Sequence, residues 1–201
     1  EFGRRYFREK FGCDIRIGYS VDSFGQNAGL PKILNATGFD RYVFMRPMAE
    51  EKTMPYLFRW RGDGGSEVVT LRVRPAYCTM PGWKEKTQLF DWIDRLIAEG
   101  DEHQTFFFGV GDHGGGIYER QLEWLLEAAE TRDIEFSTLA HYFDTIEKTE
   151  LPVYEGELTH HSPGCYSAVS MVKRQFAAVE RSLFKAEKVV LESPGPDAEA
   201  D

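Results

Sequence analysis

The stretch GYSVDSFGQNAGLP, residues 18–31, passes from a strand pattern through a polar turn into a helix pattern. Along residues 14–21 apolar side chains alternate with others, which is typical of a β-strand. After the turn, apolar residues recur at helical spacing as far as Ala36, and Gly38 follows as a C-terminal cap. The stretch therefore predicts a strand, a loop that begins near Asp22, and a helix.

The same alternation of strand and helix patterns continues along the chain. Because strands separated by helices form βα units, it predicts an α/β fold with a mostly parallel sheet. The Asp-Gly pair in GDGG, residues 62–65, predicts a hairpin turn. In such folds functional side chains gather at the carboxyl ends of the strands. Further strands are expected at 41–45, 56–60, 67–73, 105–110 and 134–136, and helices at 87–99, 118–131, from about 137, and at 168–191.

The composition is that of an acidic globular protein. The 201 residues are 42% apolar and 28% charged, with a net charge of −9. This acidic balance argues against nucleic acid or an anionic membrane surface as the partner. No apolar run approaches the roughly 18 residues that suggest a membrane span. The three scattered cysteines form no disulfide framework, so reduced thiols and a cytoplasmic location are expected.

Asp22 is the first candidate functional residue. An aspartate in such a turn also caps helices or closes Asx-turns, and these uses remain alternatives. The phrase GYSVDSFGQNAGLPKIL, residues 18–34, resembles the nucleophile motif of the α-mannosidases of glycoside hydrolase family thirty-eight. That motif is a strand, then Asp-x-Phe-Gly-His/Gln, then a helix. The resemblance implies that Asp22 is the nucleophile of a retaining glycosidase and also a ligand of a zinc ion that contacts the sugar.

The resemblance also implies a domain organisation. Residues 1–150 would be part of an irregular (β/α) barrel with mostly parallel strands, the catalytic domain, from which an N-terminal strand is missing. Residues 151–192 would be a linker and the first helix of a helical bundle, and residues 193–201 a mobile acidic tail. Because residues 1–12 already have a helix pattern, we expect the chain to be a fragment of a longer enzyme.

A glycine-rich loop, GVGDHGGGIY, occupies residues 109–118. It lacks the GK[ST] ending of a phosphate-binding loop and the dinucleotide fingerprint. It resembles a second signature of the family, which implies that Asp112 is the general acid/base. His113 is the alternative acid/base, or a contact to a mannose hydroxyl. An Asp112 that only pins the loop remains the simpler interpretation.

Two further candidates concern metal and substrate. His160 and His161 lie in LTHHSPGCYSAVSMVKR, residues 158–174, and adjacent histidines are often only part of a polar loop. The stretch resembles the start of the family's helical bundle, where a histidine completes the zinc site, and this implies His161, or else His160, as a zinc ligand. Trp60 is a candidate for packing on a sugar ring, with a position at the edge of the core as the alternative.

Part of the family's zinc site is missing from the sequence. The His-x-Asp pair that supplies two further ligands occurs nowhere in the chain, whereas zinc needs three or four protein ligands. We therefore expect the chain to bind zinc weakly or not at all and to be inactive alone. Its parent would be a zinc-dependent retaining α-mannosidase acting on mannose-containing oligosaccharides or glycosides.

Other functions are less well supported. A non-catalytic carbohydrate-binding relative with the same fold is the alternative, because it would also lack the metal ligands. A metal-dependent deacetylase is disfavoured, because no His-x-x-x-His pair occurs.

Overall fold

The computed structural model describes two compact units, which are treated separately. They are Glu1–His161 and Ser162–Asp201. Among the described helices, none combines the length and the apolar character that crossing a membrane requires. The described residues are 2–78, 83–100, 103–109, 111, 114, 116–162 and 164–193.

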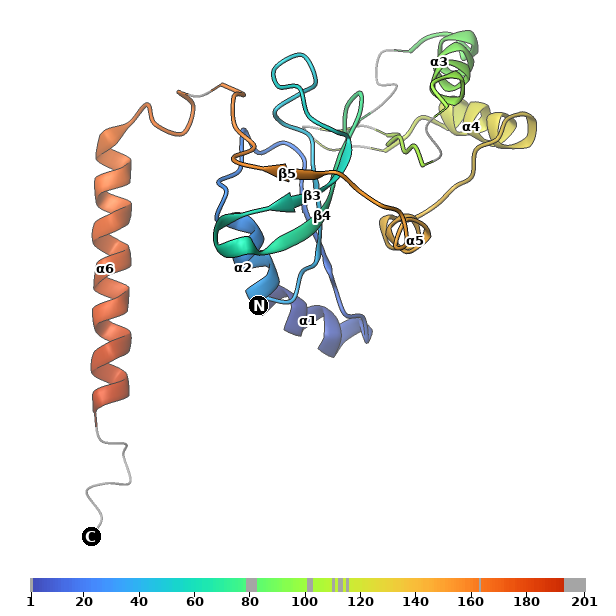
Figure 1. Ribbon diagram of the computed structural model, residues 1–201. Helices are drawn as coiled ribbons and strands as arrows, with labels where there is room; N and C mark the ends of the chain where they lie inside the picture. Colours follow the sequence, from blue (N-terminus) through green and yellow to red (C-terminus); the bar gives the residue numbers. More distant parts are fainter. Residues whose placement is uncertain are drawn as a thin grey trace. The chain divides into compact units, whose positions relative to one another are not determined.

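The first unit is built on a five-stranded sheet (Figure 1). β1, β2 and β4 are parallel neighbours, β3 is antiparallel to β4, and β5 is parallel to β3. The predicted mostly parallel sheet is therefore confirmed. In the order β1-β2-β4-β3-β5, the strands are β1 (Ile17–Ser20), β2 (Arg41–Phe44), β4 (Glu67–Arg72), β3 (Leu57–Arg61) and β5 (Val153–Glu155).

The β3–β4 hairpin turns at GDGG, as predicted. A short 3-10 turn, η1 (Asp63–Gly65), joins the two strands, and Gly64 has the positive φ, 74°, that favours glycine. Gly62 meets a different constraint, because a Cβ there would lie 2.3 Å from the carbonyl oxygen of Ala28. The hairpin turn thus packs directly against the loop that follows Asp22.

Helices follow the strands where the apolar spacing predicts them. In α2, Pro31 occupies the first turn, where a missing N–H costs nothing. In α3, Glu85 and Gln88 form a capping box at the N-terminus. The helices of this unit are α1 (Phe2–Phe11), α2 (Leu30–Ala36), α3 (Lys86–Ala98), α4 (Glu119–Thr131) and α5 (Leu139–Thr145).

Two predicted strands are not found among the described residues. Residues 134–136 form no strand, and residues 105–109 contain only a single β-bridge position, at Phe108. The run TFFF buries its apolar side chains without pairing as a strand, since Phe106 packs against the α3–α4 pair and Phe107 against the sheet. Side chains that alternate between two cores give the same sequence pattern as a paired strand.

The core lies on both faces of the sheet. Along β2 the side chains alternate, with Tyr42 and Phe44 on one face and Val43 on the other. α2 covers the first face through Leu34, and α5 covers the second through Phe143. A third cluster, between α3 and α4, consists of Leu89, Ile93, Leu125 and Ala128.

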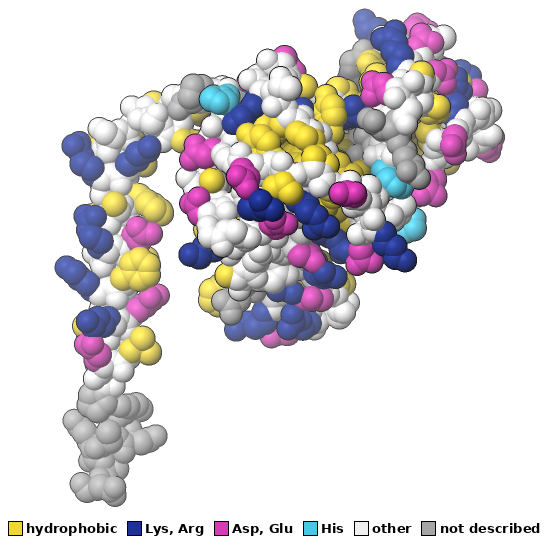
Figure 2. Space-filling model, in the orientation of Figure 1, with side chains coloured by type: hydrophobic (Ala, Val, Ile, Leu, Met, Phe, Trp, Pro, Cys, Tyr) yellow, Lys and Arg dark blue, Asp and Glu magenta, His cyan; other side chains and the backbone are white. Residues whose placement is uncertain are grey.

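In the second unit, the predicted long helix is confirmed as α6 (Ser170–Glu192), which has no buried residue. Hydrophobic side chains lie along one side of this helix and basic ones along the other (Figure 2). Its place in a helical bundle stays a prediction. The partial, irregular (β/α) barrel also stays a prediction, because the described strands form one five-stranded sheet. Of the predicted tail, only Ser193 lies within the described residues.

Candidate active site

Asp22 lies at the carboxyl end of β1, two residues beyond Ser20. Val21, between them, is 8% exposed and anchors the turn in the core. The hydroxyls of Ser20 and Ser23 are 2.5 Å apart and close the turn around Asp22. The backbone therefore directs the Asp22 carboxylate away from the core at the edge where a parallel sheet places catalytic groups.

Two side chains from neighbouring strands hold the two oxygens of this carboxylate. Arg46, which follows β2, donates from Nε to Oδ1 at 2.6 Å. Tyr77, which lies beyond the end of β4, donates its hydroxyl to Oδ2 at 3.4 Å. The Arg46 guanidinium also lies over the ring of Phe24, 5.3 Å from its centroid. Asp22 is thus oriented by groups from the next two strands of the sheet.

His161 joins this group from the far end of the unit. Its Nε2 lies 3.1 Å from Arg46 Nη1, and its Nδ1 lies 2.6 Å from Glu51 Oε1. Because a guanidinium can only donate, Nε2 accepts, and the ring proton is on Nδ1, donated to Glu51.

Glu51 is fixed from both sides. Its Oε2 accepts the backbone N–H of Met48 at 2.7 Å. Burial raises the pKa of Glu51, but the hydrogen bonds from Met48 and His161, together with the electrostatic effects of His161 and Arg46, outweigh burial and hold this pKa below its usual value of 4.5. The result is a continuous chain of polar contacts, Asp22–Arg46–His161–Glu51.

A backbone pairing brings His161 close to the Asp22 loop. Gln26 and Leu158 exchange both backbone hydrogen bonds, at 2.7 and 3.0 Å. Leu158 is fully buried. Gly25 has φ +131°, and a Cβ there would lie 3.1 Å from the Leu158 carbonyl oxygen. Glycine at this position lets the two segments approach.

The other predicted site residues do not join this group. His160 is exposed, has a φ of 101° and makes no contact with Asp22 among the described residues. Asp112 and His113 lie outside the described residues. The prediction that Trp60 contacts a sugar is wrong. Trp60 is fully buried, and its Nε1 donates to the Gly156 carbonyl at 2.8 Å. No face of its ring is open to a sugar, so the core alternative is confirmed.

The described residues do not fit a zinc ion by themselves. They contain no group of three or more histidine, cysteine, aspartate or glutamate side chains placed to hold a metal. The two predicted ligands, Asp22 and His161, both contact the Arg46 cation. Their contacts in this structure are with a guanidinium and not with a common metal position.

Arg46, Glu51 and Tyr77 are the residues that the sequence analysis missed. Arg46 follows a predicted strand, so the rule that placed Asp22 at a carboxyl end could also have found it. Glu51 and Tyr77 lie in loops whose positions depend on contacts far along the chain. No local pattern marks them.

A family model described as the N-terminal domain of the glycosyl hydrolases of family 38 matches residues 1–157. The chain belongs to this family. It is 28% identical over 182 residues to α-mannosidase G of Dictyostelium discoideum and 26% identical over 200 residues to α-mannosidase 2C1 of Homo sapiens. These matches cover 86% and 92% of the chain but 17% and 18% of the relatives. The chain therefore spans less than a fifth of their length.

Two solved structures have a similar fold. An α-mannosidase from Enterococcus faecalis has a TM-score of 0.59 at 17% identity, covering 78% of this chain and 19% of that one. A 4-α-glucanotransferase from Thermococcus litoralis has a TM-score of 0.60 at 13% identity, covering 96% and 32%. At such identities the likeness concerns the fold alone, an α/β fold shared with glycosidase-like proteins.

Proposed function

We propose that the chain is part of the catalytic domain of an α-mannosidase, which hydrolyses mannose-containing glycosides with retention of configuration, and that Asp22 is its nucleophile. Family membership and the names of the relatives support the activity. The observation that carries the assignment to Asp22 is its place at the end of β1, with Arg46 and Tyr77 each holding one of its carboxylate oxygens.

The proposed reaction has two displacements. A carboxylate oxygen of Asp22 bonds to the anomeric carbon while the glycosidic bond breaks, and Asp112 or His113 gives a proton to the leaving oxygen. Water then attacks the same carbon, gives its proton back to that residue, and releases Asp22. Arg46 and Tyr77 serve as positioning residues, because a carboxylate fixed at both oxygens keeps one direction of attack.

Zinc dependence is proposed only for a longer enzyme that includes this chain. The described residues supply no complete zinc site, so no step is assigned to the metal. The chain alone is proposed to be inactive.

The test measures hydrolysis of an aryl α-mannoside by a longer polypeptide that includes the chain, with and without chelator. Asp22→Asn keeps the shape of the side chain but removes the nucleophile, so we expect kcat to fall by roughly a thousandfold or more. Asp63→Asn, in the exposed hairpin turn, is the matched control and should retain activity. Near-normal turnover in Asp22→Asn would reject the assignment.

The second candidate is a carbohydrate-binding relative without catalysis. Arg46 contacts both Asp22 and His161. These contacts favour the second candidate, because an aspartate and a histidine that are held by an arginine can be structural and need not react with a substrate. Binding of methyl α-mannoside without turnover in the longer polypeptide, with zinc supplied, would support this candidate over the first.

A further inference from the structure

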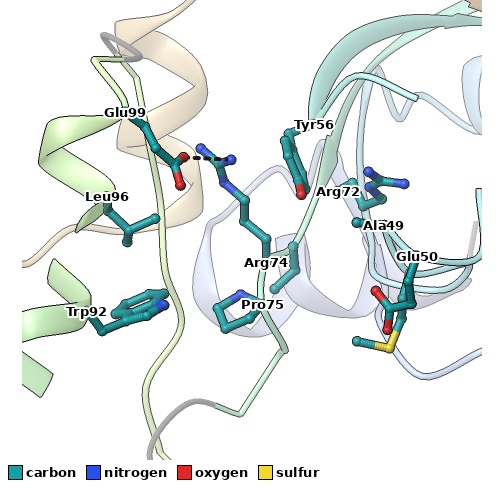
Figure 3. Close-up of a pocket in the computed structure, with 11 residues that line it drawn as sticks. Ala49, Glu50, Tyr56, Arg72, Arg74, Pro75, Trp92, Leu96 and Glu99 are labelled. Carbon is teal, nitrogen blue, oxygen red and sulfur yellow. Dashed lines mark ion pairs between the residues drawn. The ribbon is translucent and has the colours of Figure 1, made fainter. Parts of the chain in front are cut away.

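Two segments of the first unit are joined to each other near the Asp22 site. One follows β4, and the other leads into the glycine-rich loop. Between them, Arg74 Nη2 donates to Gln104 Oε1 at 2.8 Å, and Gln104 Nε2 donates to the Leu96 carbonyl at 2.6 Å. Arg74 also pairs with Glu99 at 3.1 Å, the ion pair that is dashed in Figure 3. Both segments are therefore fixed to helix α3 as well as to each other.

The second segment is anchored again just before the glycine-rich loop. Phe106 packs against the cluster between α3 and α4, and Phe107 packs against the cluster on the second face of the sheet. The ring centroid of Phe107 lies 6.4 Å from that of Tyr19, on β1. The start of the loop is thus held at the sheet, so a neighbouring side chain cannot simply push it away.

Gly111, in this loop, meets the ring of Tyr77. A Cβ at Gly111 would lie 2.3 Å from Tyr77 Cε2, and 2.8 and 3.0 Å from the Cβ and Sγ of Cys78. These distances are shorter than van der Waals contact, so glycine is the residue that lets the loop approach so closely. The backbone of Gly111 lies outside the positive-φ region. The neighbouring side chains, and not its own backbone, therefore exclude a larger residue.

Tyr77 connects this contact to the candidate nucleophile. Its hydroxyl donates to Asp22 Oδ2 at 3.4 Å, and its backbone N–H donates to Met45 Sδ at 3.3 Å. Met45 is 2% exposed, so the main chain of Tyr77 is fixed in the core and its ring is the part that can turn. A side chain at position 111 would turn this ring and carry the hydroxyl away from Asp22.

We infer that Gly111 is a positioning residue that keeps the Tyr77 hydroxyl on the carboxylate of Asp22. The inference rests on the proposed function, and it adds a mechanical link between the two proposed catalytic elements. Gly111 precedes Asp112, the proposed acid/base, by one residue in the sequence. The ring of Tyr77 thus sets the nucleophile relative to the loop that carries Asp112.

The first test measures kcat and KM for an aryl α-mannoside in a longer polypeptide that includes the chain. Gly111→Ala should lower kcat about ten- to a hundredfold and change KM by less than about twofold. Tyr77→Phe should lower kcat by a similar factor, because it removes the same hydrogen bond. The double variant should be no slower than Tyr77→Phe alone, because Gly111 acts through the Tyr77 hydroxyl.

Gly116→Ala is the matched control in the same loop. A Cβ at Gly116 would have no described atom within 4 Å, and its backbone lies outside the positive-φ region. The variant should therefore keep the kcat of the parent polypeptide.

The second test needs no catalysis. In the 201-residue chain with ¹³C-labelled tyrosine, the spectrum of Tyr77→Phe identifies the ring signals of Tyr77. Gly111→Ala should shift these signals and Gly116→Ala should not, so unshifted signals in Gly111→Ala overturn the inference. If Gly111→Ala does not fold, adding Tyr77→Leu should restore folding, because leucine has no Cε2. A double variant that stays unfolded also overturns the inference.

The kinetic outcomes separate this inference from the proposed function. Normal kcat in Gly111→Ala, or losses in Gly111→Ala and Tyr77→Phe that multiply in the double variant, overturn the inference. Multiplied losses would mean that the alanine acts on Asp112 and not through Tyr77. An equal loss in Gly116→Ala overturns the inference as well. Normal turnover in Asp22→Asn rejects the proposed nucleophile, and a coupled loss in Gly111→Ala and Tyr77→Phe would then still support the positioning of Tyr77.

Discussion

Trp60 shows how an aromatic residue with two sequence interpretations is assigned by its surroundings. The ring lies 5.9 Å from Tyr42, and its N–H reaches the Gly156 carbonyl. Alternation along β3 predicts only that Trp60 faces the same side as Phe58. Which side is covered depends on α2 and on Leu158, both distant in the chain. The sequence could therefore name this residue but could not decide between core and sugar site.

Trp60→Phe should lower the free energy of unfolding by about 1–3 kcal/mol, because it leaves a cavity in the core and removes the hydrogen bond from Trp60 to the Gly156 carbonyl. Urea denaturation followed by circular dichroism measures this change. Trp124→Phe, at a partly buried position on α4, should cost less. An unfolding free energy unchanged in Trp60→Phe would contradict the core assignment.

At the scale of elements, the strands β1 to β4 and most helices could be predicted from periodicity. The rule that functional side chains gather at the carboxyl ends of parallel strands then placed Asp22 at the edge of the sheet where the structure has it. The contacts that complete the candidate site could not be predicted, because they join loops. Arg46, Glu51 and His161 meet through the pairing of Gln26 with Leu158, which depends on the whole intervening fold.

The packing of α3 against α4 includes an ion pair with a predictable response to pH. Arg132 donates from Nε to Asp94 at 2.7 Å, and this hydrogen bond lowers the pKa of Asp94 below its usual value of 3.8. A lowered folded-state pKa stabilises the fold above the unfolded value and is lost as the pH falls through the folded value. Asp94→Asn should therefore lower the melting temperature at pH 7.

The same variant should differ less and less from the parent chain as the pH falls from about 3.8 through the lowered pKa of Asp94 in the folded state, because the carboxylate of the parent chain is protonated over that range. Thermal melts between pH 7 and pH 3 measure this convergence. Glu123→Gln, which removes a charge at an exposed position on α4, should show no such convergence. A constant difference across the pH range would mean that the Asp94 charge is not the stabilising feature.

At the scale of the whole molecule, the first unit contains the three hydrophobic clusters that the structure describes. The clusters of the first unit contain no residue of α6. The hydrophobic side of α6 predicts a helix from sequence but does not say what covers it.

A chain shortened to residues 1–168 should therefore keep the unfolding midpoint of the longer chain to within about 2 °C. The helical circular dichroism signal of the shorter chain should fall by the contribution of the 23 residues of α6. Differential scanning calorimetry on both chains tests this. Loss of a cooperative transition in the shorter chain would show that α6 is required by the first unit.

The pairing of the Asp22 loop with the segment before His161 also sets an order of events during synthesis. Asn27 and Glu157, which are hydrogen-bonded, are separated by 130 residues. The ribosome therefore releases Asp22 long before the segment that pins its loop, and closing so long a loop is slow. A nascent or truncated product that stops short of Leu158 carries Asp22 at the end of a complete strand but lacks the segment that holds the Asp22 loop in place. Such products should be the natural targets of proteases at the unpinned loop.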